Sequence, residues 1–330
     1  MIKIQKIIEY LSENITDPVP NYIMQKEIYK ESVNNPNYKN AYKQMRESKW
    51  YLELVNEQLN DGSWGRFHTQ DSKAPKRKFV TTETALRRAH ELSLSKDDQI
   101  ITKCIKLMER YVLDKETWTD SVEKHHDNGK SHLYSRSFVT AANINLFDPE
   151  NSVIKPKRDI FVKTLKVSLE KGYFDEEVWE NENKNYRGPC LNGWNAYPLM
   201  IFQNSKCMDD TLQRKYLNYI WNRKDGIYYL TDYPISDIIS VEDNRFNSWL
   251  KTLWYFSGFS LFEEIIKKDV LKHLIKEIER LINNDIVLPG NGGIGTAYNI
   301  RYADKWSSKN EKKVDMILRI TRVIIKYCNK

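Results

Sequence analysis

The sequence predicts an all-α protein in which helical hairpins follow one another around a closed (α/α) toroid, five to six hairpins in two concentric helix layers. Three observations predict it. Apolar residues recur at three- and four-residue spacing through most of the chain. Strand patterns are limited to short runs at 228–230 and 237–241. Similar segments also return at a nearly constant interval.

The interval is set by a helical stretch that starts at Trp50 and runs into an Asp61–Gly62 turn followed by a tryptophan. Degenerate copies of this arrangement occur at 113–118, 171–179 and 223–229. The aromatic markers are 54, 56 and 54 residues apart and are Trp64, Trp118, Phe174 and Tyr228. That spacing suits one helical hairpin with its two connections.

A second helix is expected after each turn, and the predicted ranges are 79–94, 133–147, 189–203, 245–262 and 311–328. The middle three are less charged than the helices before them, which predicts apolar inner helices and polar outer ones. An N-terminal pair at 2–14 and 20–33 adds a further hairpin. We therefore expect residues 1–330 to form a single domain in which residues 1–35 close or cap the ring.

The composition fits a folded globular protein. The chain has 330 residues, of which 40% are hydrophobic, and 52 Lys plus Arg against 45 Asp plus Glu give a net charge of +7. This mild excess predicts no nucleic-acid partner. No secretory signal or run of about 18 apolar residues is present, so we expect a cytoplasmic protein without an integral membrane segment. Contact with a membrane surface stays open, and the oligomeric state is not predicted.

Residues 58–65, with Gln58, Gly62 and Trp64 at their characteristic spacing, resemble the QW repeat of the terpene cyclase and prenyltransferase superfamily. In that family the glutamine joins adjacent hairpins and the tryptophan stacks over the next repeat. The resemblance implies an (α/α) toroid with a central cavity for an isoprenoid. It is specific in residues 50–86 and extends only as a general pattern over residues 38–330.

The sequence departs from that family at the residues that carry its chemistry. Thr84 and Ala85 align with the end of the acidic DxDDTA motif, so Thr82 replaces the central acid and Glu83 alone is carboxylic. Glu83 is therefore the candidate catalytic acid, and the alternative is an ion pair with Arg87 four residues later. Cys190 lacks the aspartate of the family's zinc motif, so we expect no zinc site.

Ligand-binding residues are predicted on one rim, where the long connections 60–78, 114–132, 172–188, 223–244 and 285–310 meet. Guanidinium groups at this rim would bind an anion, and the candidates are Arg77, Arg87, Arg136, Arg187, Arg245 and Arg301. The alternative is that they pair with neighbouring acids. Aromatic candidates for the cavity wall are Tyr134, Trp194, Tyr197 and Trp249, with Phe138, Trp254 and Phe256. The alternative for these is the core between the layers.

Asp243 is a second candidate catalytic residue, because Glu242 and Asp243 form the only adjacent carboxylate pair at the start of a predicted inner helix. We expect no cofactor, although such a pair leaves Mg²⁺ open as an alternative to helix capping. His125, His126 and His132 match no closed metal site, so we expect no metal there.

The leading functional hypothesis is that the toroid binds an amphiphilic anionic ligand, such as an isoprenoid diphosphate. Its reaction would be a cyclisation started by Glu83 or a prenyl transfer. Aromatic and arginine side chains also suit an enzyme that acts on acidic carbohydrate, which is the first alternative. The second alternative is a binding or interaction protein without catalysis, because the acidic motif is missing.

Overall fold

A computed structural model of the chain describes residues 4–68, 77–118, 130–183, 192–266, 268–283, 286, 288, 301–304 and 309–328, with the backbone alone for 130–135 and 309. The predicted all-α class is confirmed, because the described residues contain helices and no strand, and two isolated bridges lie at 195–231. None of the helices in these ranges is both long enough and apolar enough to cross a bilayer.

The helices follow one another along the chain with connections of very different lengths. In order they are α1 (Ile4–Asn14), α2 (Pro18–Ile23), the π-helix η1 (Met24–Ile28), α3 (Pro36–Glu47), α4 (Lys49–Glu57), α5 (Thr82–Glu91), α6 (Gln99–Val112), α7 (Lys130–Asn145), α8 (Lys155–Ser168), α9 (Glu176–Glu182), α10 (Ala196–Phe202), α11 (Asp210–Trp221), α12 (Phe246–Phe256), α13 (Phe262–Ile265), α14 (Lys268–Asn283) and α16 (Lys309–Cys328).

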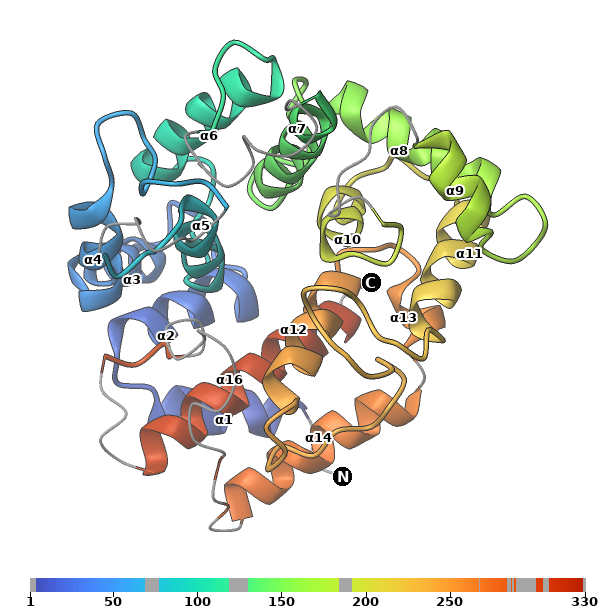
Figure 1. Ribbon diagram of the computed structural model, residues 1–330. Helices are drawn as coiled ribbons and strands as arrows, with labels where there is room; N and C mark the ends of the chain where they lie inside the picture. The colour runs from blue at the N-terminus through green and yellow to red at the C-terminus, as the bar shows by residue number, and fades with distance from the viewer. Residues whose placement is uncertain are drawn as a thin grey trace.

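The path of the chain brings its last helix beside its first ones (Figure 1). Some helices pack on their neighbours in sequence, as α2 does on α3 and α6 on α7, and others on helices farther along the chain, as α7 does on α10. α16 packs on α14, α12, α1 and η1. The buried apolar side chains form one continuous cluster that extends from Ile7 to Ile325, so the described helices share a single core.

Side-chain caps fix where α5 and α10 begin. Thr81 accepts a hydrogen bond from the Thr84 N–H before α5, and Asn195 accepts one from the Tyr197 N–H before α10. Both helices are shorter than predicted for this reason. α12 is shorter than the predicted 245–262 because the chain turns after Phe256, where the Gly258 carbonyl accepts a hydrogen bond from the Asn204 N–H at 2.8 Å.

The segment 58–65 bonds to both α4 and α6. The Gln58 amide donates to the carbonyls of Gly62 at 3.0 Å and of Ile100, in the first turn of α6, at 2.7 Å. The fully buried Trp64 donates from Nε1 to the Leu54 carbonyl at 2.8 Å. Gly62 has a φ of +97°, and a Cβ there would lie 2.7 Å from the Lys103 oxygen. These contacts tie the end of α4 to the start of α6, and only glycine fits at position 62.

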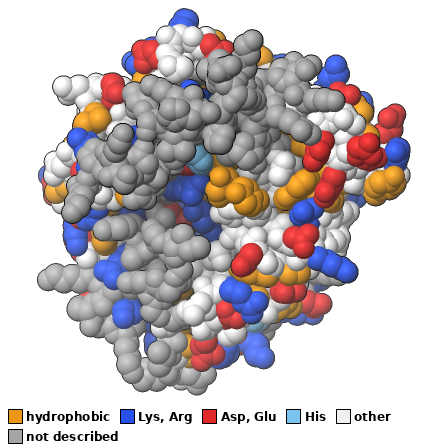
Figure 2. All heavy atoms as spheres, in the orientation of Figure 1, with side chains coloured by type: hydrophobic (Ala, Val, Ile, Leu, Met, Phe, Trp, Pro, Cys, Tyr) orange, Lys and Arg blue, Asp and Glu red, His pale blue; other side chains and the backbone are white. Residues whose placement is uncertain are grey.

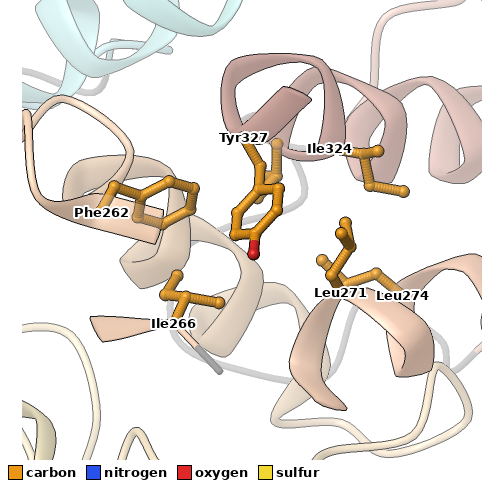
Figure 3. A pocket seen from close by; sticks show the side chains of 7 residues that line it. Phe262, Ile266, Leu271, Leu274, Ile324 and Tyr327 are labelled. Carbon is orange, nitrogen blue, oxygen red and sulfur yellow. The ribbon is translucent and has the colours of Figure 1, made fainter. Parts of the chain in front are cut away.

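A small apolar gap remains where α13 and α14 meet α16 (Figure 3). The side chains around it come from those three helices and include Phe262, Ile266, Leu271, Leu274, Ile324 and Tyr327. A ligand pocket needs a few convergent polar groups to orient its ligand. This gap has apolar walls throughout and is therefore an imperfection of core packing.

Candidate functional site

The carboxylate of Glu83, in the first turn of α5, gathers polar side chains from four segments. His68 Nδ1 lies 2.8 Å from Oε2, and the Tyr197 hydroxyl donates to Oε1 at 2.7 Å. Arg87 Nη2 donates to Oε1 at 3.0 Å, and Asn143 Nδ2 from α7 lies 3.4 Å from it. We call these five residues the Glu83 hub. The Glu83 side chain is 5% exposed, so nearly all of its hydrogen-bonding capacity is used inside the protein.

Backbone hydrogen bonds place the members of the Glu83 hub. The N–H groups of Thr82 and Glu83 donate to the carbonyls of Arg66 and Phe67 at 2.7 and 3.0 Å. The chain before α5 therefore runs alongside its first turn, which brings His68 to the carboxylate. Tyr197 lies in the first turn of α10, held there by the Asn195 cap, and its side chain is almost fully buried.

Glu83 is ionised at neutral pH. Burial by itself raises the pKa of the carboxyl group, but the charge of Arg87 and the hydrogen bond from His68 outweigh it, and the pKa lies well below its usual range. A group with such a low pKa is a poor proton donor. The alternative role that we considered for Glu83, an ion pair with Arg87, is the one observed, at 3.0 Å.

The same carboxylate orients the imidazole of His68. An ionised carboxylate accepts only, so Nδ1 carries the hydrogen that lies between it and Glu83, and Nε2 is then the basic nitrogen. The His68 side chain is 18% exposed. Sequence reasoning missed this residue, because a single histidine in the connection after Trp64 carries no periodic signal.

A second buried cluster lies at the other end of α5, and we call it the closure cluster. Arg322 donates from Nε and Nη2 to the two oxygens of Glu27, at 2.8 and 2.6 Å. Arg319 donates to Glu91 at 3.2 Å, and Tyr302 donates to the same carboxylate at 3.0 Å. These contacts connect η1, α5 and α16, so they join the beginning of the chain to its end.

Charge balance explains why the closure cluster is stable. Burial raises the pKa of Glu27, but the charge and hydrogen bonds of Arg322 lower it to about 2. The guanidinium of Arg322 has 0% side-chain exposure and lies 3.7 Å from the ring centroid of Trp254. The opposite charges of Arg322 and Glu27 compensate each other inside the protein. Removing either residue would leave the other as an uncompensated charge.

Lys251, on α12, carries a positive charge between the two clusters. Its ammonium group forms no hydrogen bond or ion pair with the described part of the chain, although it is close enough to feel the charges of Arg87, Glu91 and Glu83. Burial and the charge of Arg87 lower the pKa of Lys251 to about 8. Figure 2 shows a hollow near the middle of the face in view, with Lys and Arg side chains and a histidine inside it.

Of the predicted site residues, Glu83, Arg87 and Tyr197 come together. Trp249 is fully buried and donates to the Ile235 carbonyl at 3.0 Å, so it belongs to the core. Trp194 is partly buried beneath the Arg223 guanidinium, at 4.3 Å. Phe138 and Phe256 are also core residues. For these four aromatic residues the core alternative describes the packing better than the cavity wall.

Asp243 lies in a surface ion pair. Its carboxylate binds the Arg245 guanidinium at 2.7 Å, and the hydrogen bonds from Arg245 lower its pKa. Glu242 binds Arg280 instead, so the two adjacent carboxylates do not converge on one point. Within the described ranges no group of three metal-binding side chains is present. Asp243 has no hydrogen bond or ion pair to the Glu83 hub.

Three of the remaining predicted arginines lie within the described residues. Arg77 is exposed, whereas Arg136 and Arg301 are partly buried. The carbonyl of Arg301 accepts a hydrogen bond from Arg88 at 2.6 Å. Arg187, His125 and His126 lie outside the described residues, as do the side chains of His132 and Tyr134.

Comparison of the chain with protein families, with curated proteins and with solved structures gives no match. The resemblance of residues 58–65 to the QW repeat therefore depends on the sequence pattern alone. What the site can do follows from its geometry, which offers an oriented imidazole beside two cationic side chains.

A half-buried histidine beside the closure cluster predicts how stability depends on pH. His90 lies edge-on to Phe147 and Trp254, at 5.9 and 5.6 Å between ring centroids. Burial, with the charge of Lys326, lowers its pKa to about 4, against about 6.5 in an unfolded chain. Between these two pKa values the folded protein binds fewer protons than the unfolded chain. The contribution of neutral His90 to stability is therefore complete above pH ~6.5 and is lost as the pH falls towards 4. We expect a loss of up to roughly 3 kcal/mol in unfolding free energy.

Urea unfolding between pH 4 and pH 7.5 measures this loss, and His90→Gln is the control because its side chain does not titrate. The variant should lose the dependence between pH 6.5 and 4.5 and keep the steeper fall below pH 4.5, where Glu27 and Glu83 protonate on unfolding. An equal slope in both proteins above pH 4.5 would show that another group is responsible.

Proposed function

We propose that the helices close into an (α/α) toroid with two concentric layers around a central hollow. The packing of α16 on α1 and η1 supports closure. In Figure 1, α5, α7, α10, α12 and α16 lie nearer the middle of the view than α4, α6, α8, α11 and α14, which supports an inner and an outer layer. In this arrangement the Glu83 hub and Lys251 belong to inner helices and face the hollow.

The ligand that we propose is a polar anion. Arg87 keeps 28% of its side chain exposed while it binds Glu83, and Lys251 has no described partner for its charge. An incoming carboxylate would satisfy the ammonium group and be shared with the guanidinium. The charged hub is a poor surface for an apolar chain, because binding such a chain would bury polar groups without partners.

The substrate class that fits both features is an acidic carbohydrate, whose carboxylate would bind between Arg87 and Lys251. The two cations withdraw charge and acidify the C–H next to that carboxylate. His68 Nε2 takes this proton, the bond from the neighbouring carbon to the linking oxygen breaks, and a carbon–carbon double bond forms. The departing oxygen takes a proton from water, and His68 returns its proton to solvent.

Hydrolysis is less well supported. A glycoside hydrolase of the usual kind needs one carboxyl group that is protonated at the working pH. In this site burial raises the pKa values of Glu83 and Glu91, but the neighbouring arginines outweigh it and hold both below their ordinary range. Proton abstraction by an oriented histidine needs no such acid.

The observation that carries the proposal is the contact of His68 Nδ1 with the ionised Glu83 carboxylate, 2.8 Å away, beside Arg87 and Lys251. An imidazole oriented by a carboxylate is an effective base. Isoprenoid binding remains the second candidate, supported by the contacts of Gln58 and Trp64 that suit a QW-type repeat. That support concerns the fold alone, and proteins with the same fold can have different activities.

Calorimetric titration with uronic acid oligosaccharides, with neutral oligosaccharides of equal length and with geranylgeranyl diphosphate tests the proposal. We expect binding of the uronates alone, and an increase in ultraviolet absorbance as the unsaturated product forms. Uronate binding without this product would favour a binding protein. Binding of the diphosphate alone would return the isoprenoid hypothesis to first place, and no binding at all would contradict both.

A further inference from the structure

Two tyrosine rings lie on the surface next to the Glu83 hub. Tyr228 and Tyr229 are 50% and 45% exposed, and their ring centroids are 4.3 Å apart at an angle of 48°. The Tyr229 ring also lies 6.1 Å from the His68 ring and 5.9 Å from the Tyr197 ring, edge to face in both cases. We call Tyr228 and Tyr229 the tyrosine pair, and it adjoins the base of the proposed reaction.

The loop that carries the pair is fixed at both ends. Ile227 and Thr231 exchange two backbone hydrogen bonds, at 3.0 and 2.9 Å. Gly226 has a φ of +70°, and a Cβ there would lie 2.4 Å from the Thr231 oxygen, so only glycine permits this turn. On the other side, the Tyr228 N–H donates to the Trp194 carbonyl at 3.0 Å.

The start of α10 completes this attachment. The Ala196 N–H donates to the Tyr228 carbonyl at 3.1 Å. Because Tyr197 is the next residue, the loop is held to the same turn of helix that supplies the hub with its tyrosine. The positions of the exposed rings are therefore set relative to His68 and Glu83.

Tyr229 is held in an unfavourable backbone conformation. Its φ is +71°, in the left-handed region that residues with a Cβ rarely occupy. Burial of the ring does not offset this strain, because nearly half of the side chain faces solvent. Strained residues of this kind are concentrated at binding and catalytic sites, where the surrounding structure enforces them.

We propose that the tyrosine pair is a stacking subsite for a second sugar ring, adjacent to the unit whose carboxylate meets Arg87 and Lys251. This inference rests on the proposed function and makes the substrate an acidic oligosaccharide of at least two units. A sugar ring offers a flat C–H face to an aromatic ring and hydroxyl groups at its edge to polar neighbours. His68, whose side chain is 18% exposed beside the Tyr229 ring, is such a neighbour.

Calorimetric titration with galacturonate and mannuronate monosaccharides and trisaccharides tests the subsite. In the unaltered protein we expect a trisaccharide to bind more tightly than its monosaccharide. Tyr229→Ala should weaken trisaccharide binding by about tenfold and leave monosaccharide binding unchanged, while Tyr229→Phe should stay within about twofold of the unaltered protein. Tyr173→Ala is the matched control, because Tyr173 is 60% exposed and lies in another loop.

Tyr229→Gly separates a functional ring from a merely structural one. Glycine relieves the left-handed strain, so the melting temperature should rise while trisaccharide binding falls as in Tyr229→Ala. Unchanged trisaccharide affinity in Tyr229→Gly and Tyr229→Ala would overturn the subsite and leave the proposed function intact, provided that the monosaccharides bind. If the unaltered protein binds no uronate of either length, the proposed function fails and the subsite with it.

Discussion

Replacing Arg322 with methionine is expected to lower the free energy of unfolding by about 3–5 kcal/mol. The guanidinium binds both oxygens of Glu27 and has no exposed side-chain area. Without it, the Glu27 carboxylate stays in a protein environment with its main counter-charge removed. Since this pair joins η1 to α16, hydrogen exchange should also rise in α1, η1 and α16 before it rises in α6 and α8. Urea unfolding and hydrogen exchange measure the two effects.

The double variant Arg322→Met with Glu27→Leu provides the decisive control. It removes both charges, so it should recover a large part of the stability that the single variant loses. Arg214→Met is the surface control, because Arg214 and Glu264 form a pair with side chains that are 45% and 50% exposed. Its loss should be below about 1 kcal/mol. A similar small loss for Arg322→Met would contradict the role that we give to the closure cluster.

The second large effect concerns His68. His68→Gln should lower kcat on an acidic oligosaccharide by about 10²–10⁴-fold, because the base is removed. KM should change little, since in the proposed site Arg87 and Lys251 would bind the carboxylate. A glutamine amide can still donate to Glu83, so the folded state should be retained. The rate of formation of the unsaturated product, measured by ultraviolet absorbance, gives both constants.

Two further variants distinguish a base from a structural histidine. Glu83→Gln leaves a side chain of the same shape that no longer holds the imidazole by charge, so kcat should fall and its pH dependence should shift. His273→Gln is the control, because His273 binds the Ile239 carbonyl on another helix and should not affect kcat. Unchanged turnover in His68→Gln would exclude His68 as the base.

Local sequence signals predicted the elements but only part of the site. The turn after Asp61 was recognised in the sequence. The caps at Thr81 and Asn195 were not, and the helices expected at 79–94 and 189–203 begin later, at Thr82 and Ala196. The Glu83 pair with Arg87 was also accessible, because residues four apart in a helix are neighbours. The pattern could not indicate that His68 and Tyr197, 129 residues apart, would meet at one carboxylate.

The difference between local sequence signals and tertiary contacts also explains where the aromatic residues lie. Trp249 and Phe256 have the composition of a cavity wall, but which face of α12 points inwards depends on how that helix packs on α10 and α16. The structure places both in the core and leaves Tyr228 and Tyr229 exposed. A hydrophobic pattern gives the apolar face of a helix, and the neighbours of that face are decided by the packing of the whole chain.

The amino-acid sequence by itself determined that this protein is helical. Periodicity, caps and turns act over a few residues, so they can be recognised without knowing the rest of the chain. Only the tertiary structure decided which charged groups are buried together, because Arg322 meets Glu27 across 295 residues when the last helix packs beside the first. Contacts of that range have no local sequence signature, since their energy depends on burial and geometry that exist only after the chain has folded.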